Sequence, residues 1–322
     1  MKQKTAMVGG QALIEGVLMK GPERTAIAVR TPDKSIDISY IEEKHLKDSH
    51  AFFALPLIRG AVNFVESMIM GYRALMISAE KSGMAELEET ENDKKSKKGN
   101  NAFLGGVMVL ASVLGVVLAL FLFLYLPACV FDLINYLSNN ILSNAVRPIF
   151  EGILKIGIFL AYIAAVGSTK DIRRVFMYHG SEHKSIFCYE NGLELTVENV
   201  RKQSRFHPRC GTSFMIIMLV VGMLFSFVTV TLFPSITKYR VLWVVIKLLL
   251  VPLVCGLGYE LIRICGKYHN PLTRAISAPG MWVQRLTTKE PDDDMIEVAI
   301  ASLKAVLPEY KESPEEESEN KE

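Results

Sequence analysis

The segment AFLGGVMVLASVLGVVLALFLFLYL, residues 102–126, decides the fold class because it carries no charge over a length that can cross a bilayer. A membrane-spanning helix needs about 20 consecutive, mainly apolar residues. Further apolar segments lie at about 149–168, 213–233 and 241–262. The sequence therefore predicts a mainly α-helical, polytopic membrane protein. Its four or so transmembrane helices form two pairs, within 102–168 and within 213–262.

Lysine and arginine are distributed unevenly around these four segments. The run KKSKK precedes the first one, and the segment 169–212 holds eight basic residues: Lys170, Arg173, Arg174, Lys184, Arg201, Lys202, Arg205 and Arg209. Cytoplasmic loops carry the excess of positive charge. We therefore predict a multi-pass protein with the N-terminus, the segment 169–212 and the C-terminus in the cytoplasm. Topology explains the basic segment, so no nucleic-acid partner is expected.

Residues 1–80 are predicted to hold a small module and a helix. In the module, residues 1–50, the stretches TAIAVRT (25–31) and SIDISY (35–40) are typical of two short strands joined by a turn. In the helix, residues 51–80, the polar side chains of Arg59, Asn63 and Glu66 fall on one stripe. We interpret it as an amphipathic helix lying in the membrane interface, or else as a span whose polar stripe faces a bundle.

The remaining segments are polar. Residues 81–101 are predicted to be a charged, disordered linker and 311–322 an acidic, disordered tail. Between the last span and this tail, the cytoplasmic segment 263–310 contains an amphipathic helix at 292–306. Its PDDD start is interpreted as a helix cap in preference to a metal site. Glu260, near the end of the last span, is expected to sit at the interface, although a place in a functional cavity is the alternative.

The stretch MYHGSEHKSIFCYE, residues 177–190, holds the residues that indicate chemistry. His179 and His183 lie one helical turn apart with Glu182 beside the second, which is the H-x-x-E-H order of one class of zinc peptidases. His207 and Cys210 follow in the same cytoplasmic segment. Histidine and cysteine are side chains that zinc prefers. The sequence therefore predicts a site for zinc, or another divalent transition metal, with candidate ligands His179, His183, His207 and Cys210.

Glu182 is the candidate catalytic residue. A catalytic zinc keeps one position for water, and a nearby carboxylate can accept the proton of that water. The third ligand, after the two helical histidines, could be His207, Cys210 or Glu190. A closed shell of four protein ligands would instead make the metal structural. Without a metal, the histidines would lie at the membrane surface and hydrogen-bond headgroups or backbone.

Four separated motifs resemble one family. They are GGQALIEGVLMKGP (9–22), YHGSEHKSIFCYE (178–190), HPRCGTSF (207–214) and PGMWVQRLTTKEPDDDMIEVAI (279–300). Together they resemble the YqhQ-like bacterial membrane proteins, family 1385 of the domains of unknown function, whose label is predicted metal-dependent enzyme. The resemblance implies a protein of the bacterial plasma membrane. It places the family's predicted metal residues on His179, Glu182, His183, His207 and Cys210, and it supplies no substrate.

The resemblance also draws attention to two motifs outside the histidine segment. In GGQALIEGVLMKGP (9–22), we expect a tight turn and a short interfacial helix. Alternatively, this segment folds against the histidines, with Glu15 as metal ligand or base. In the motif at 279–300, Trp282 and Arg285 are expected to anchor at the lipid headgroups. Alternatively, they line a substrate groove.

Two functions follow from these patterns. The first is an integral-membrane, metal-dependent hydrolase with a zinc-type site at the cytoplasmic face, acting on a peptide bond of a membrane protein or on a lipid ester. The alternative is a non-enzymatic assembly factor, scaffold or transport subunit, in which the histidine segment is a structural metal site or a docking loop. The lipid bilayer is the expected partner in both cases, and a homo-oligomer is left open.

Overall fold

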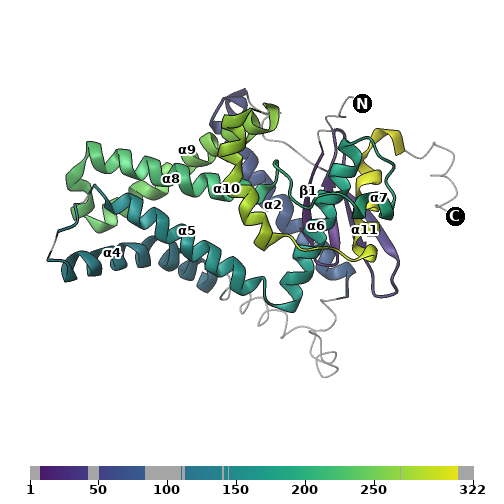
Figure 1. Cartoon of the computed structure of the whole chain (residues 1–322), viewed down its shortest axis with the longest axis horizontal. Coiled ribbons are helices and arrows are strands. Elements are labelled where there is room, and N and C mark those ends of the chain that lie inside the picture. The colour runs from purple at the N-terminus through teal and green to yellow at the C-terminus, as the bar shows by residue number, and fades with distance from the viewer. Residues whose placement is uncertain are drawn as a thin grey trace, which may run out of the picture.

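The computed structural model describes residues 8–42, 51–83, 110, 113–139, 141–143, 145–268 and 270–310. A bundle of long helices occupies one end of the molecule, and a mixed α/β module occupies the other (Figure 1). Residues 84–101 of the predicted linker and the whole predicted tail, 311–322, lie outside the described ranges.

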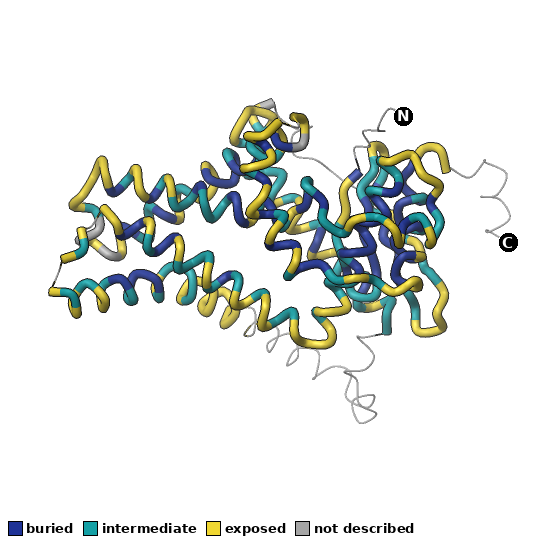
Figure 2. Tube along the Cα trace, in the orientation of Figure 1, coloured by how far each residue is buried: buried dark blue, intermediate teal, exposed yellow. Residues whose placement is uncertain are grey.

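Within the described residues, four helices are long and apolar enough to cross a membrane, which confirms the predicted class. They are Val113–Leu137, Arg147–Val166 (α5), Gly211–Leu232 (α8) and Val241–Cys265, the last within α9 (Arg240–Lys267). Helix α8 packs against both α5 and α9. The outward surface of the bundle is largely exposed, whereas the interior of the module is buried (Figure 2). Apolar side chains such as Leu118, Val228 and Leu249 lie on this outward surface, as lipid contact requires.

The first span differs from the prediction at its C-terminal end. We expected it to end at Leu126, before Pro127, but the helix continues to Leu137 as α4 (Leu126–Leu137). A π-helical turn, η3 (Phe121–Tyr125), comes directly before it. Proline has no backbone N–H to donate inside a helix, and a wider turn ahead of it accommodates this loss without ending the helix. Of the predicted span 102–126, residues 102–109, 111 and 112 lie outside the described residues.

The module is built on a four-stranded antiparallel sheet in the order β1-β2-β3-β4. The strands are Gly9–Leu13 (β1), Gly16–Lys20 (β2), Thr25–Arg30 (β3) and Ile36–Ile41 (β4). The last two confirm the predicted strands. The first motif contains β1, a two-residue turn with Glu15 at φ 50°, and β2. The expected interfacial helix there is therefore wrong.

Helices cover both faces of this sheet. Alternate side chains such as Val17, Met19, Ala26 and Ala28 pack against α6 (Lys170–Glu190) and α11 (Asp293–Val306). The intervening residues Leu13, Leu18, Ile27 and Val29 pack on the other face against Ala74 of α2 (Ile58–Lys81). The central strands β2 and β3 are thus buried on both faces, and α6, which carries the histidines, packs against the sheet and α11.

Helix α2 also connects the module to the bundle. Near its start, Gly60 lies against Gly256 of α9, and Arg59 forms a two-armed ion pair with Glu260, with both distances 2.7 Å. This pairing accounts for Arg59 in the predicted polar stripe and for Glu260 at the end of the last span. An exposed apolar stripe runs along the helix, through Val65, Met68, Ile69, Tyr72 and Met76. Such a stripe suits the predicted interfacial position.

The chain returns from the last span through α10 (Pro271–Thr287) to α11. The predicted helix at 292–306 is confirmed within one residue. Asp292 occupies the N-cap position without a side-chain capping bond, and Asp293 and Asp294 lie in the first turn, where carboxylates interact favourably with the helix dipole. Short elements complete the chain: α7 (Val197–Arg201), η1 (Ala51–Ala54), η4 (Pro234–Lys238) and η5 (Pro308–Tyr310).

Candidate metal centre

Helix α6 places His179 and His183 on the same face, one turn apart, with ring centroids 4.4 Å apart. Each ring is held by a backbone carbonyl. His179 Nδ1 lies 2.9 Å from the Thr287 oxygen, and His183 Nδ1 lies 2.6 Å from the Arg205 oxygen. A carbonyl can only accept, so each Nδ1 carries the proton and each Nε2 keeps a free lone pair. This second contact is what orients metal-binding histidines in proteins.

Cys210 meets the two histidines from a different element. It is the N-cap residue of α8, and its Sγ lies 3.2 Å from His179 Nε2. Its side chain also hydrogen-bonds to His183. The three ligand atoms of His179, His183 and Cys210 all lie within 4.8 Å of one another. Two imidazoles and a thiol at this separation form a ligand set suited to zinc.

The surroundings favour the ligand form of these side chains. Burial alone raises the pKa of the Cys210 thiol, but its contacts with His183 and Thr212 outweigh burial and hold the pKa below the ordinary value. Burial, with a smaller contribution from His179, lowers the pKa of His183. Thiolate sulfur and neutral imidazole are the forms that bind a metal.

Glu182 lies next to this group and outside it. Its side chain is only 4% exposed, and its Oε2 has no hydrogen-bond partner among the described residues. Burial raises the pKa of Glu182 to about 8, while nearby His179 opposes the rise and Cys210 adds to it. A buried carboxylate oxygen without a partner is costly. A metal-bound water is one partner that would satisfy it.

Strand β1 covers this glutamate. A Cβ added to Gly10 would lie 2.9 Å from both Cγ and Cδ of Glu182, so only glycine leaves room for that side chain. The same strand borders a cavity of about 560 Å³. Its lining includes Gly9–Ala12, the three ligand residues, Glu182 and the first turn of α8. The candidate ligands thus face an open space.

The other predicted ligands border this group without belonging to it, and the His207 and His183 ring centroids are 5.7 Å apart. His207 Nε2 faces Glu190 Oε2 at 3.4 Å, and its Nδ1 accepts from the Arg209 N–H at 3.3 Å. Glu190 also pairs with Arg209. The structure therefore brings three of the four predicted metal residues together, with Cys210 as the third member, and places His207 beside them with both ring nitrogens engaged.

The first motif folds against α6, as its alternative interpretation required, but Glu15 does not join the histidines. Its carboxylate pairs with both arms of Arg174, at 2.5 and 2.6 Å, and accepts from the Tyr178 hydroxyl at 3.1 Å. The role of Glu15 as metal ligand or base is thus wrong. Its contacts fasten the β1–β2 turn to α6.

Sequence reasoning missed the residue that positions the His207 segment. Gln284 of α10 is fully buried, accepts from the His207 N–H at 2.8 Å and donates to the His207 carbonyl at 2.7 Å. The sequence offered one signal for this role, which is an amide on the inner face of an amphipathic helix. Its neighbours Trp282 and Arg285 are exposed and line a separate cavity of about 360 Å³.

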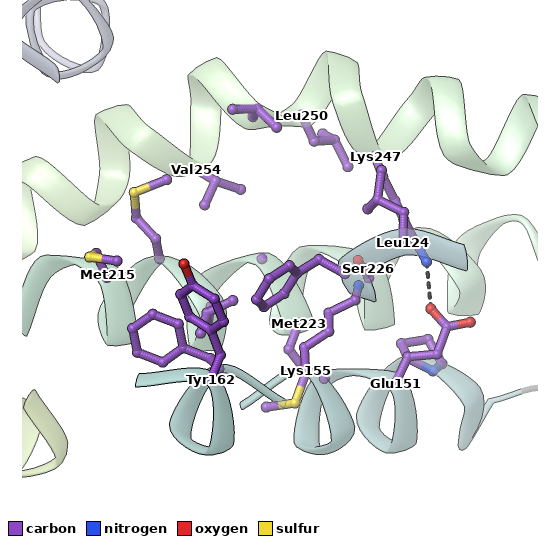
Figure 3. A pocket seen from close by; sticks show the side chains of 18 of the residues that line it. Leu124, Glu151, Lys155, Tyr162, Met215, Met223, Ser226, Lys247, Leu250 and Val254 are labelled. Carbon is purple, nitrogen blue, oxygen red and sulfur yellow. Dashed lines mark hydrogen bonds and ion pairs between the residues drawn. The ribbon is translucent and has the colours of Figure 1, made fainter. Parts of the chain in front are cut away.

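A further cavity lies inside the bundle, between α5, α8 and α9 (Figure 3). It has a volume of about 530 Å³ and is mainly apolar, with Lys155 and Ser226 directed into it. At one end Glu151 bridges Lys247 and Arg147, and the Arg147 Nε–Glu151 Oε1 distance is 2.9 Å. Glu151 is only 1% exposed. The sequence identified Glu260 as the notable acid of the spans, whereas Glu151 is the more deeply buried of the two.

Comparison with known proteins gives a family and a relative. A family model described as "Protein of unknown function (DUF1385)" matches residues 55–309. The "Uncharacterized protein YqhQ" of Bacillus subtilis (strain 168) is 35% identical over 304 residues, which cover 93% of this chain and 92% of that protein. No solved structure matches.

Proposed function

Because this chain belongs to the DUF1385 family of proteins of unknown function, its activity has to be inferred from its own residues, and we propose that it is a membrane-embedded, metal-dependent hydrolase. The centre would be of the zinc type, held by His179, His183 and Cys210. The observation that carries the proposal is the convergence of two carbonyl-oriented histidines on one cysteine, next to a buried carboxylate whose Oε2 has no partner among the described residues.

The number of ligands supports catalysis over a structural role. Structural zinc sites are closed by four protein ligands, whereas catalytic sites use three and keep a position open. Within the described residues, His207 is engaged elsewhere and the Glu182 carboxylate is not part of the three-residue group. The fourth direction would therefore be available to water from the adjoining cavity.

Each side chain would then have one role. A bound zinc ion lowers the pKa of its water to about 7. His179, His183 and Cys210 would hold the ion, while the Thr287 and Arg205 carbonyls fix the two imidazoles. The charge of a bound cation would offset the rise that burial causes in the Glu182 pKa. Glu182, which lines the same cavity as the three ligands, would then take a proton from the attacking water and return it to the leaving group. β1 and α6 shield this carboxylate from bulk solvent.

The setting of the proposed centre is the membrane surface. The cavity includes Gly211, Thr212 and Met215 from the first turns of α8, so it lies where a span enters the module. The distribution of basic residues favours the cytoplasmic side of a bacterial plasma membrane. A membrane protein or a lipid could reach the site from the bilayer, and a homo-oligomer is compatible with it.

Metal content tests the centre. Full-length protein purified in detergent should hold about one zinc per chain by elemental analysis. His179→Ala, His183→Ala and Cys210→Ala should each lose most of it, since two protein ligands hold zinc far more weakly than three. His207→Ala is the matched control and should keep its zinc. Stoichiometric zinc in all four variants would exclude the proposed ligand set.

Glu182→Gln separates catalysis from the alternative function. The glutamine keeps the shape of the side chain but cannot take up a proton, so this variant should retain zinc and fail to replace the natural protein in a deletion strain grown in competition with its parent. If Glu182→Gln restores full fitness while the histidine variants do not, the metal is structural, and an assembly factor, scaffold or transport subunit is the better description.

A further inference from the structure

Strand β1 has one unpaired edge. It is the first strand in the order β1-β2-β3-β4, so among the described residues only one of its sides has a neighbouring strand. In an antiparallel pair, every second residue turns its N–H and C=O away from the partner strand. The residues Leu13 and Gly16 flank the two-residue turn and form a hydrogen-bonded pair. By alternation, Gly10 and Ala12 are the residues that point their backbone groups outward.

These outward groups have no other partner in the described chain. The backbone hydrogen bonds of Gly9–Ala12 within the described residues are those of the β1–β2 ladder. Proteins usually cover such an edge or break it with charge or proline, since it can pair with another strand. Here the edge is short and begins with the two exposed glycines Gly9 and Gly10, which allow another backbone to approach closely.

Strand β1 borders the cavity of the proposed centre. Gly9–Ala12 line the same cavity as Glu182 and the three ligand residues. Gly10 lies directly against the Glu182 side chain. A chain that extended along β1 would therefore pass the proton acceptor and the metal ligands.

We propose, as a deepening of the proposed function and resting on it, that the substrate is an extended peptide segment that pairs with β1 as an additional strand. A peptide supplies the N–H and C=O groups that the edge requires, at the spacing of a strand, and strand addition is a general mode of peptide recognition. An acyl chain offers neither group. Filling the cavity with one would bury the backbone groups of Gly10 and Ala12 unpaired, which is costly.

The reaction is a balanced hydrolysis. The oxygen of one water molecule forms a bond to the carbonyl carbon of the peptide, and the C–N bond breaks. Glu182 takes a proton from that water and passes it to the nitrogen that leaves. The products are a carboxylic acid and an amine, and no other reactant is consumed. Pairing with β1 would hold the scissile carbonyl in place for this attack.

Two hydroxamates test the inference. N-acetyl-Ala-Leu-hydroxamate and decanohydroxamate share a zinc-binding head and differ in having a peptide or an alkyl chain. Their affinities are measured by titration calorimetry on zinc-loaded, full-length protein. We expect the peptidyl compound to bind at least tenfold more tightly. Ala12→Pro removes one outward N–H, a change that edge strands accommodate, and should reduce this preference about tenfold while leaving the alkyl compound unaffected.

Two controls separate loss of backbone pairing from misfolding of the variant. Ala12→Gly keeps the N–H and should keep the preference. If Ala12→Pro fails to fold, a peptidyl hydroxamate N-methylated at its backbone amides makes the same test on the natural protein. The peptide inference is overturned if the two compounds bind equally well, if the alkyl compound binds more tightly, or if zinc-loaded protein binds neither. None of these outcomes would contradict the proposed metal centre. A chain that holds no zinc overturns the proposed function, and this inference with it.

Discussion

The contact between β1 and Glu182 can be tested with two adjacent glycines. A Cβ at Gly10 would lie 2.8 Å from the Leu18 carbonyl oxygen and 2.9 Å from two atoms of Glu182, whereas a Cβ at Gly9 would meet nothing within 4 Å. Overpacking of this kind costs about 1–3 kcal/mol. The Leu18 oxygen belongs to the β1–β2 ladder and Glu182 is buried, so neither can move aside cheaply. Gly10→Ala should therefore lower the free energy of unfolding by about that amount.

Gly9→Ala is the matched control. It makes the same chemical change one residue away, on the same strand, and should be neutral or stabilise by about 0.4–1 kcal/mol through a less flexible unfolded chain. Thermal unfolding of the two purified variants, followed by intrinsic fluorescence, gives the comparison. Gly10→Ala should also weaken zinc binding, because Glu182 is pushed toward the ligands. If Gly10→Ala unfolds at the same temperature as Gly9→Ala, β1 does not lie on Glu182 and the described cavity is wrong.

Two further substitutions test packing around the centre and within the bundle. Gln284→Leu removes the partners of the His207 N–H and C=O and should cost about 1–3 kcal/mol for each buried group left unpaired. By contrast, Arg285→Leu on the exposed side of α10 should change the free energy of unfolding by less than about 0.5 kcal/mol; equal effects would contradict the placement of Gln284. Glu151→Ala removes the buried acid that Arg147 and Lys247 share, leaves Arg147 with Asp132 alone, and should cost about 3–5 kcal/mol. Asp132 also pairs with Arg147, but its side chain is 37% exposed. Asp132→Ala should therefore cost under about 1 kcal/mol. A larger loss of stability would contradict the assignment of Glu151 as the central acid.

The sequence predicts most of the helices because their signals are local. Long apolar runs locate the spans, the run TAIAVRT locates β3, and the alternation in SIDISY locates β4. The strands β1 and β2 escape this reasoning because the glycines at positions 9, 10, 16 and 21 break up their apolar stretch. β2 is covered by α6 and α11 on one face and by α2 on the other, so GVLMK is a continuous apolar run without alternation. Strands buried on both faces generally read this way.

The residues of the candidate site were likewise predictable only where their sequence signal is local. His179 and His183 follow from helical spacing, because two residues four apart must share a face. The choice of Cys210 over His207 depends on where α8 begins and on how Gln284 holds the His207 backbone. The carbonyls of Thr287 and Arg205, which orient the two imidazoles, belong to the backbone and leave no trace in residue type. Long-range packing therefore places Cys210, and not His207, with the two histidines.

X-ray absorption at the zinc edge of the purified, full-length protein tests the central claim most directly. We expect a first shell with two imidazole nitrogens at about 2.0–2.1 Å, one sulfur at about 2.3 Å and one lighter atom for the open position. The sulfur contribution should disappear in Cys210→Ser, and His207→Ala should leave the spectrum unchanged. A shell without sulfur, a third imidazole that is lost in His207→Ala, or a protein without bound zinc would contradict it.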